Sequence, residues 1–323
     1  MQSYFFKIAL AALTLLLASG VGAQTEYPNK PLRMVVPYPP GASTDSLGRI
    51  VAQKISVSMG QPVVVDNKGG ASGNIGSDFV AKSAADGYTL MVGTDATHTA
   101  NLFLTVAPTF HPIKDFTALT QAVANPIVLV VHPGIPAKNL TELIAYCKQH
   151  PDQLAYGSSG TGSPHHLAGE LLKQFTGVPF VHVAYRGGGP AVTDLLGGQI
   201  PMVFSSLITV LPHIKSGKLK AIGFTQTSRY PGLPQVPTFA ETLPGFEMNS
   251  WLGFFAPAKL PPAVTKRLHG ELVKALRDNE VAAKLDGMGL MVVANSAEDF
   301  AEQVRKELEQ RGKLIQQAGI KPE

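Results

Sequence analysis

The chain of 323 residues carries 27 Lys and Arg against 23 Asp and Glu, a formal net charge of +4, and 45% of its residues are hydrophobic. This size allows a large buried core, whereas the mild positive balance, without any basic run, makes nucleic acid a poor partner. The single cysteine, Cys147, excludes an internal disulfide, and we expect a buried, unreactive thiol because it falls within a helical pattern.

The first 23 residues have the pattern of a secretory signal peptide. Lys7 is the only charge before an apolar run over 8–18, and Val21-Gly22-Ala23 supplies the small residues that a signal peptidase reads. A membrane anchor is the alternative, but about 10 to 12 apolar residues fall short of the roughly 20 that span a bilayer. We expect cleavage after Ala23 and a periplasmic protein. The 300 residues left by removing 23 from 323 favour two lobes.

The mature chain alternates expected strands and helices. Strands over 32–36, 63–65 and 88–92 alternate with helices over 46–58 and 74–83. Strands over 127–131, 154–156, 181–183, 202–204 and 221–224 follow, with a helix over 140–149 and helices that begin near His165 and Pro190. Two amphipathic helices, over 261–276 and 296–317, close the chain. This alternation predicts a parallel α/β architecture.

A loop rich in small residues follows the first strand, over 37–45 (PYPPGASTD). Gly41 permits a tight turn, and Ser43, Thr44 or Asp45 is expected to cap the next helix. Backbone N–H groups and the positive end of the helix dipole then face one space, which suits a carboxylate or another small anion. Tyr38 either offers a ring face to that ligand or serves only in packing.

A second such loop, 156–164 (YGSSGTGSP), precedes the helix near His165. The run nearly spells a dinucleotide fingerprint, but His165 occupies the third glycine position, and neither Ser158 nor Ser159 lies in a G-x-S-x-G pentapeptide. His165 and His166 point about 100° apart on a helix, which argues against a shared metal ion. We interpret them as structural, with the alternative that one of them lines a cleft.

The third loop, 185–191 (YRGGGPA), has three glycines and then a proline at a helix start. This pattern favours a close approach of the backbone to a ligand. Arg186 either clamps a carboxylate through two hydrogen bonds or forms a surface salt bridge between loops.

Together with these loops, five further segments resemble the tripartite tricarboxylate transporter substrate-binding proteins, also called the Bug family. They are 67–76 (NKGGASGNIG), 85–90 (ADGYTL), 195–199 (LLGGQ), 211–217 (LPHIKSG) and 234–238 (PQVPT). The resemblance implies a type II periplasmic binding protein, in which two α/β lobes joined by two crossover strands close over a ligand. Residues 24–124 plus 225–323 would form the first lobe and 125–224 the second, with crossings near Ala124 and Thr225 and the C-terminal helices bracing the first lobe.

The resemblance also implies a site. Members of this family typically hold a carboxylate between the loop after the first strand and two helix starts of the second lobe. Carried over, this selects Tyr38, Gly41, Ala42, Ser43, Thr44, Asp45, Ser159, Gly160, Thr161, Ser163, Gly187, Gly188 and Gly189. Thr94, His98, His165, Arg186 and Ser205 complete the candidate set. A small carboxylate ligand and the membrane subunits of a tripartite tricarboxylate-type transporter are the implied partners. We expect a monomer with no catalytic activity, no cofactor and no metal.

Two departures from the family pattern bear on the ligand. Ser205-Ser206 stands where many relatives have an Asp-Asn or similar pair, and Gly41-Ala42-Ser43 stands where they often have Gly-Gly. Hydroxyl groups replace an acidic side chain that would repel a second carboxylate. The expected ligand is a di- or tricarboxylate or an aromatic carboxylate such as a phthalate-type acid, and the hydroxyls suggest the hypothesis of a bulkier or aromatic acid.

Two other functions stay open. A ligand sensor that presents its closed form to a histidine kinase would use the same fold. An exported hydrolase would use Ser159 as nucleophile with His165 or His166 as base. It would also need a group that orients the histidine and an oxyanion hole, neither of which the sequence identifies.

Overall fold

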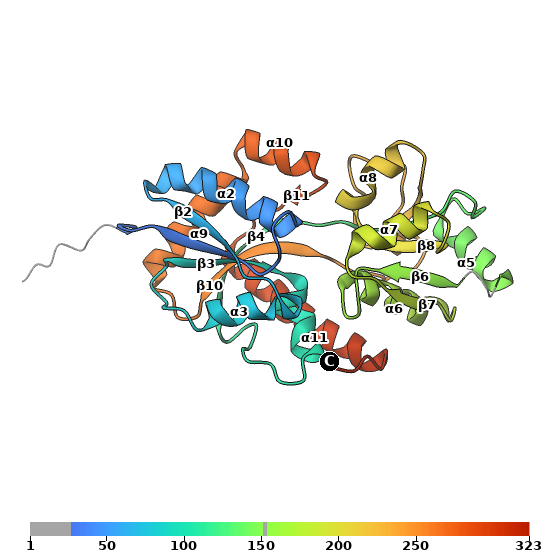
Figure 1. The fold of residues 1–323 in the computed structure, drawn as a ribbon, viewed down its shortest axis with the longest axis horizontal. Coiled ribbons are helices and arrows are strands. Elements are labelled where there is room, and N and C mark those ends of the chain that lie inside the picture. Colours follow the sequence, from blue (N-terminus) through green and yellow to red (C-terminus); the bar gives the residue numbers. More distant parts are fainter. Residues whose placement is uncertain (1–26, 151–153, 323) are drawn as a thin grey trace, which may run out of the picture.

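The computed structural model describes residues 27–150 and 154–322, so the expected signal peptide and its cleavage site lie outside the described residues. The described chain forms two α/β lobes that lie side by side and are joined by two extended segments (Figure 1). Within these residues, no helix combines the length and the apolar character that crossing a membrane requires.

The first lobe is built on a six-stranded sheet in the order β11-β4-β10-β3-β1-β2. Its strands are β1 (Leu32–Val36), β2 (Val63–Asn67), β3 (Thr89–Thr94), β4 (Phe116–Ala124), β10 (Trp251–Pro257) and β11 (Met291–Val292). β1 pairs in parallel with β2 and β3, whereas β10 runs antiparallel to β3 and β4. The α/β architecture is as predicted, but the sheet is mixed and not wholly parallel, because β10 enters from the other lobe and is inserted between β3 and β4.

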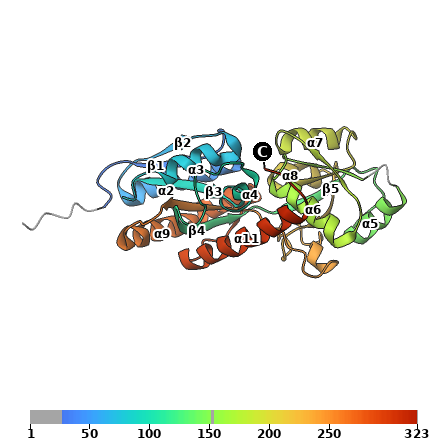
Figure 2. The same cartoon turned by 90° about the horizontal axis from the view of Figure 1, so that it is seen from below.

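Helices cover both faces of this sheet (Figures 1 and 2). On one face lie α2 (Ser43–Met59), α9 (Pro262–Leu276) and α10 (Asn279–Gly287), and on the other α3 (Asn74–Ala81) and α11 (Ala297–Gln317). Leu47 and Val51 of α2 share a buried core with Leu268 of α9. Trp251 of β10 and Phe300 of α11 anchor the core on the opposite face. Each helix buries an apolar stripe, so the lobe is a three-layer sandwich.

The second lobe repeats this plan around five strands in the order β7-β6-β8-β5-β9. They are β5 (Ile127–Val131), β6 (Ala155–Ser158), β7 (Val181–Ala184), β8 (Met202–Ser206) and β9 (Lys220–Phe224), flanked by α5 (Leu140–Gln149), α6 (Pro164–Thr176), α7 (Gly188–Leu196) and α8 (Leu207–Lys215). β6 is parallel to β7 and β8, whereas β5 is antiparallel to β8 and β9. In each lobe, the strand that directly follows a crossing, β5 or β10, therefore runs antiparallel to both of its neighbours.

The two crossings lie at 125–126 and at 249–250. The first immediately follows Ala124, next to the position that the sequence indicated. After β9, however, the chain stays with the second lobe, since Phe239 and Phe246 are buried in its core and the N–H of Met248 donates to Thr225 O at 3.0 Å. We therefore assign residues 225–248 to the second lobe and place the second crossing about 25 residues after Thr225.

Helix α11 contacts both lobes. Its first half packs on β4 and the core around Trp251, while Leu314 and Ile315 near its end belong to the core of the second lobe. Figure 2 shows the helix running from under β4 to α6. The two expected C-terminal helices, α9 and α11, both pack on the first lobe, and α11 in addition contacts the second lobe.

The crossing segments pair with each other and with a buried carboxylate. Asn125 N donates to Ser250 O at 2.8 Å, and Ser250 Oγ donates to Asp95 Oδ1 at 3.1 Å. Asp95 is 3% exposed, and this burial, assisted by Glu307 and opposed by Arg311, raises its pKa to about 7. The folded state therefore binds a proton that the unfolded state releases near its ordinary value of 3.8.

Asp95→Asn should stabilise the protein more at high pH than at low pH. As the pH rises from the pKa of Asp95 in the unfolded state to its pKa in the folded state, the wild-type protein loses stability, because the buried carboxyl must ionise. The neutral amide of the variant does not ionise and keeps its stability. The free energy of unfolding of D95N relative to wild type should rise between about pH 4.5 and pH 8, by about 3 kcal/mol. Urea unfolding at both pH values measures this, with Asp286→Asn, an exposed carboxylate, as control. A difference that stays constant with pH would contradict the raised pKa.

Candidate functional site

A cleft of about 680 Å³ lies between the lobes. Its first-lobe wall contains Tyr38, the short helix η2 (Ala71–Gly73) and the start of α4 (Asn101–Leu104), and its second-lobe wall contains the loops that precede α6 and α7. The two walls touch where Gly162 meets Leu104, since a Cβ on Gly162 would lie 2.2 Å from Leu104 Cδ1. The cleft is thus bounded by residues far apart in the sequence.

Six residues of the predicted set line this cleft. They are Tyr38, Ser159, Gly160, Thr161, Ser163 and Arg186. All except Tyr38 come from the second and third glycine loops, so the structure brings these two loops together as expected.

The second loop is shaped by the start of α6. Ser163 is the N-cap, and its side chain accepts from His166 N at 3.2 Å, while Pro164 occupies the first helical turn. The residues before the cap therefore turn away from the helix axis and form the wall of the cleft.

The third loop is tied to the second. Gly187 is the N-cap of α7, has a φ of +108° that favours glycine, and donates its N–H to Ser159 O at 3.2 Å. Gly187, Gly188 and Gly189 are not among the residues that line the cleft. Arg186 does line it, and within the described chain its side chain forms no ion pair, so the salt bridge between loops is absent there.

The first loop differs from the prediction. α2 begins at Ser43 with Ala42 as N-cap and no side-chain cap, and Gly41, Ala42, Ser43 and Thr44 do not line the cleft. Asp45 also lies outside it, because its carboxylate accepts from Gly41 N at 3.0 Å, Arg49 Nε at 3.0 Å and Asn67 Nδ2 at 2.9 Å. Burial opposes these hydrogen bonds, but they lower the pKa of Asp45. The loop is held by its own carboxylate, which leaves Tyr38 as its contribution to the cleft.

Three further candidates are buried behind the wall. Thr94 lies under Tyr38, with its Oγ1 3.3 Å from the tyrosine hydroxyl, and Ser205 is fully buried on β8. His98 belongs to the π-helical turn η3 (Ala96–Ala100), which directs its ring against Phe255 at a centroid distance of 3.6 Å. This burial lowers the pKa of His98 to about 3. None of the three faces the cleft.

His165 connects the cleft to the first crossing. Its Nδ1 lies 2.7 Å from Ser159 Oγ and its Nε2 lies 3.2 Å from Ser206 Oγ, which in turn accepts from Asn125 Nδ2 at 3.2 Å. When the Ser206 hydroxyl donates to Nε2 while its oxygen accepts from Asn125 Nδ2, the His165 proton lies on Nδ1. Burial lowers the pKa of His165 to about 4, so the ring is neutral at pH 7. With the His165 proton on Nδ1, Ser159 Oγ accepts a hydrogen bond from the ring and can present its own O–H to the cleft.

The same contacts bear on the hydrolase hypothesis. A nucleophilic serine must give its proton to the histidine, which requires the opposite tautomer, and the base needs an orienting group such as a carboxylate. Here the second ring nitrogen of His165 meets the Ser206 hydroxyl. His166 is directed elsewhere, since it accepts from Gly162 N at 2.9 Å and stacks on His182. In the part of the chain that the structure describes, no three His, Cys, Asp or Glu residues are grouped as metal ligands.

The cleft also contains residues outside the three loops that the sequence indicated. Ser72, with a φ of +55°, and Asn74 follow β2, and Asn101 Nδ2 holds them by donating to Ser72 O at 2.9 Å and to Asn74 Oδ1 at 2.8 Å. The glycine-rich run over 67–76 was the sequence signal for this wall. Lys321, beyond α11, also lines the cleft and had no signal.

The electrostatic character of the cleft is cationic. Arg186 and Lys321 line it, no Asp or Glu is among its lining residues, and within the described chain neither cation has an ion-pair partner. Hydroxyl groups of Ser159, Thr161 and Ser163 add donors beside them. Such a surface favours an anionic ligand with more than one acceptor.

Known proteins share this arrangement. The family model described as tripartite tricarboxylate transporter family receptor matches residues 47–320. The chain is 35% identical over 307 residues to Protein BugT of Bordetella pertussis, with 94% of each chain covered. Among solved structures, an R. palustris protein with adipate has a TM-score of 0.82 and 33% identity, covering 92% of this chain and 100% of its own.

Two further structures agree. Periplasmic binding protein BugD has a TM-score of 0.78 and 32% identity, over 92% of this chain and 100% of its own. MatC from Rhodopseudomonas palustris with bound malate has a TM-score of 0.76 and 30% identity, over 90% and 100%. These likenesses confirm the predicted family and the two-lobe periplasmic binding protein fold. The chain belongs to the tripartite tricarboxylate transporter receptor family, the Bug-type solute-binding proteins.

Proposed function

We propose that this protein captures a small organic carboxylate in the cleft between its lobes and delivers it to the membrane subunits of a tripartite tricarboxylate-type transporter. The observation that carries this proposal is the cleft itself, which contains two cations without ion-pair partners in the described chain and no acidic lining residue. We further propose export to the periplasm by cleavage after Ala23, and action as a monomer.

The contacts on offer are sufficient for useful affinity. Hydrogen bonds to a charged group contribute about 1.5 to 3 kcal/mol each. Four or five of them, from Arg186, Lys321 and the serine and threonine hydroxyls, give roughly 6 to 15 kcal/mol before the costs of association. We therefore expect dissociation constants in the micromolar range, equivalent to about 8 kcal/mol.

Aliphatic dicarboxylates are the ligand class that we favour. The adipate and malate complexes of the related proteins support this choice. Ser205 and Ser206 do not line the cleft, so the substitution of hydroxyls for an acid there gives no direct support to an aromatic ligand. Tyr38, Tyr185 and Leu104 nevertheless provide an apolar wall, and a phthalate-type acid stays in the test panel.

Closure of the lobes provides the signal for delivery. A carboxylate held by Arg186 of the second lobe that also contacts the first-lobe wall at Tyr38 binds the closed form better than the open form. A membrane partner that contacts both lobes can then distinguish loaded from empty protein. The same closure would serve a sensor kinase, and the identity of the partner decides between these two roles.

The first test is a thermal-shift and calorimetry screen of residues 24–323 with adipate, malate, citrate, phthalate and benzoate. A ligand at about 100 times its dissociation constant stabilises the folded state by about 2.7 kcal/mol, so a micromolar ligand raises the melting temperature measurably. We expect a dicarboxylate to give the largest shift. If none of the acids binds, and the protein hydrolyses p-nitrophenyl acetate in a manner lost in Ser159→Ala, the hydrolase hypothesis replaces this one.

Arg186→Ala and Lys321→Ala should each weaken binding of the best dicarboxylate about tenfold or more, because each removes one charge-assisted hydrogen bond. Both side chains are exposed, so the melting temperature of the unliganded variants should match that of wild type. Lys266→Ala, on the exposed face of α9, is the control for the loss of one positive charge. Equal affinity for R186A, K321A and K266A in calorimetry would show that the two cations do not contact the ligand.

Ser206→Ala should weaken the same ligand although Ser206 does not line the cleft. Without the Ser206 hydroxyl, the His165 proton is no longer held on Nδ1, and Ser159 donates inward to the ring instead of to the ligand. A loss of about tenfold is expected, close to the lower end of the range for one hydrogen bond to a charged group. In the double variant with Ser159→Ala, the two losses should not add. Additive losses in calorimetry would show that the serines act independently.

A further inference from the structure

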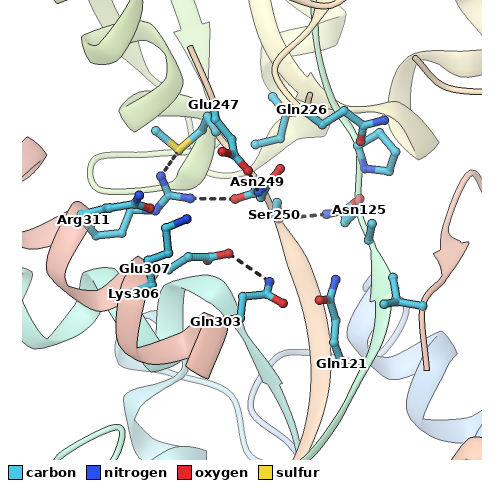
Figure 3. Close-up of a pocket in the computed structure, with 16 residues that line it drawn as sticks. Gln121, Asn125, Gln226, Glu247, Asn249, Ser250, Gln303, Lys306, Glu307 and Arg311 are labelled. Atoms are coloured by element: carbon cyan, nitrogen blue, oxygen red, sulfur yellow. Dashed lines mark hydrogen bonds between the residues drawn. The ribbon is translucent and has the colours of Figure 1, made fainter. Parts of the chain in front are cut away.

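A second cavity lies at the hinge, separate from the residues that line the cleft. This hinge groove measures about 370 Å³ and is bounded by both crossing segments and by α11 (Figure 3). Gln121 and Asn125 contribute from the end of β4 and the first crossing, Glu247 from the approach to the second, and Lys306 and Arg311 from α11. No residue is shared with the cleft.

The groove contains buried polar groups with unmet hydrogen-bonding capacity. Gln121 is 7% exposed, and within the described chain its side-chain amide makes no hydrogen bond. Asn125 is 8% exposed, and its Oδ1 is buried without a hydrogen-bond partner. In Figure 3, Gln121 and Gln303 extend into the space between the hinge segments and α11. Because buried amides in folded proteins are nearly always satisfied, these groups indicate a polar occupant.

Two cations and two anions line the groove, and they differ in how far other protein groups already bind them. Arg311 is engaged, since it donates to Asn249 O at 2.7 Å and contacts Met248 Sδ, and Glu307 accepts from Trp251 Nε1 at 2.7 Å. Lys306, by contrast, has no ion-pair partner within 4 Å in the described chain, although it lines the same cavity. Glu247 accepts one hydrogen bond, from Asn249 Nδ2 at 2.6 Å, but it has no ion-pair partner in that part of the chain either. One cation and one anion without an ion pair are therefore available.

We propose that the hinge groove is a second binding site, for a small zwitterion of the α-amino-acid type. Its carboxylate binds Lys306, its ammonium binds Glu247, and the amides of Gln121 and Asn125 hydrogen-bond its polar atoms. A dianion, the ligand class proposed for the cleft, is disfavoured because Glu247 and Glu307 face the same space. A zwitterion satisfies both charges without adding net charge.

The test is calorimetry of residues 24–323 with glycine, L-alanine and L-glutamine as probes. At least one of them should bind with a dissociation constant below about 1 mM. Lys306→Ala and Glu247→Gln should each weaken that binding about tenfold or more, the effect expected for one charge-assisted hydrogen bond. Lys313→Ala, on the same helix and paired only with Glu309 in the described chain, is the matched control and should bind as wild type.

The double variant Ser159→Ala with Arg186→Ala separates the groove from the cleft. If the groove is the site, this variant retains amino-acid binding, and K306A and E247Q retain the affinity of wild type for the best dicarboxylate. Both groove side chains are exposed, so melting temperatures should be unchanged. The proposal is overturned if none of the three amino acids binds at up to about 10 mM, a concentration that detects even very weak sites. It is also overturned if binding is lost in the cleft double variant but persists in K306A and E247Q.

Discussion

The pairing of Asn125 with Ser250 is the constraint on which the arrangement of the two lobes depends. Asn125 N donates to Ser250 O at 2.8 Å, so the two crossing segments are joined at the point where the chain passes between lobes. Strand pairing fixes both sides of this point, because β10 is inserted between β4 and β3 and β5 between β8 and β9. Movement between the lobes is therefore confined to a few residues, while each sheet moves as a unit.

Helix α11 limits that movement further. Arg311 of this helix donates a hydrogen bond to Asn249 O in the second crossing, and Glu307 accepts one from Trp251. Near the end of the helix, Leu314 and Ile315 pack in the core of the second lobe. Rotation of the lobes must slide the end of α11 against that core, which favours a small set of packed positions over a continuous range. Lys321 lies shortly after this helix and lines the cleft, so the position of this cation depends on how the end of α11 packs.

The sequence pattern located those strands and site residues whose position depends on neighbouring residues in the chain. It did not locate those whose position depends on packing against distant segments. Apolar runs located β1, β3, β5 and β8, and the glycine loops before α6 and α7 located one wall of the cleft. β10 was missed, although all its residues are buried, because Trp251–Pro257 has neither alternation nor β-branched residues and its strand partners lie more than a hundred positions away. His98 and Asp45 were assigned to the site by their place after a strand, but His98 turns into the core and Asp45 binds its own loop. Lys321 reaches the cleft only through the packing of α11.

Asn125 lines the hinge groove and is connected to the cleft by a chain of hydrogen bonds. Its amide nitrogen donates to Ser206, which begins the chain of hydrogen bonds through His165 to Ser159 in the cleft, while its amide oxygen is the buried acceptor of the hinge groove. Asn125 also pairs with Ser250, which donates to Asp95 in the first lobe. A rotation at the crossing turns one planar amide whose two ends face different sites. We expect the donor direction at Ser159 and the shape of the groove to change together when the lobes rotate about the crossing, since both changes involve the same amide.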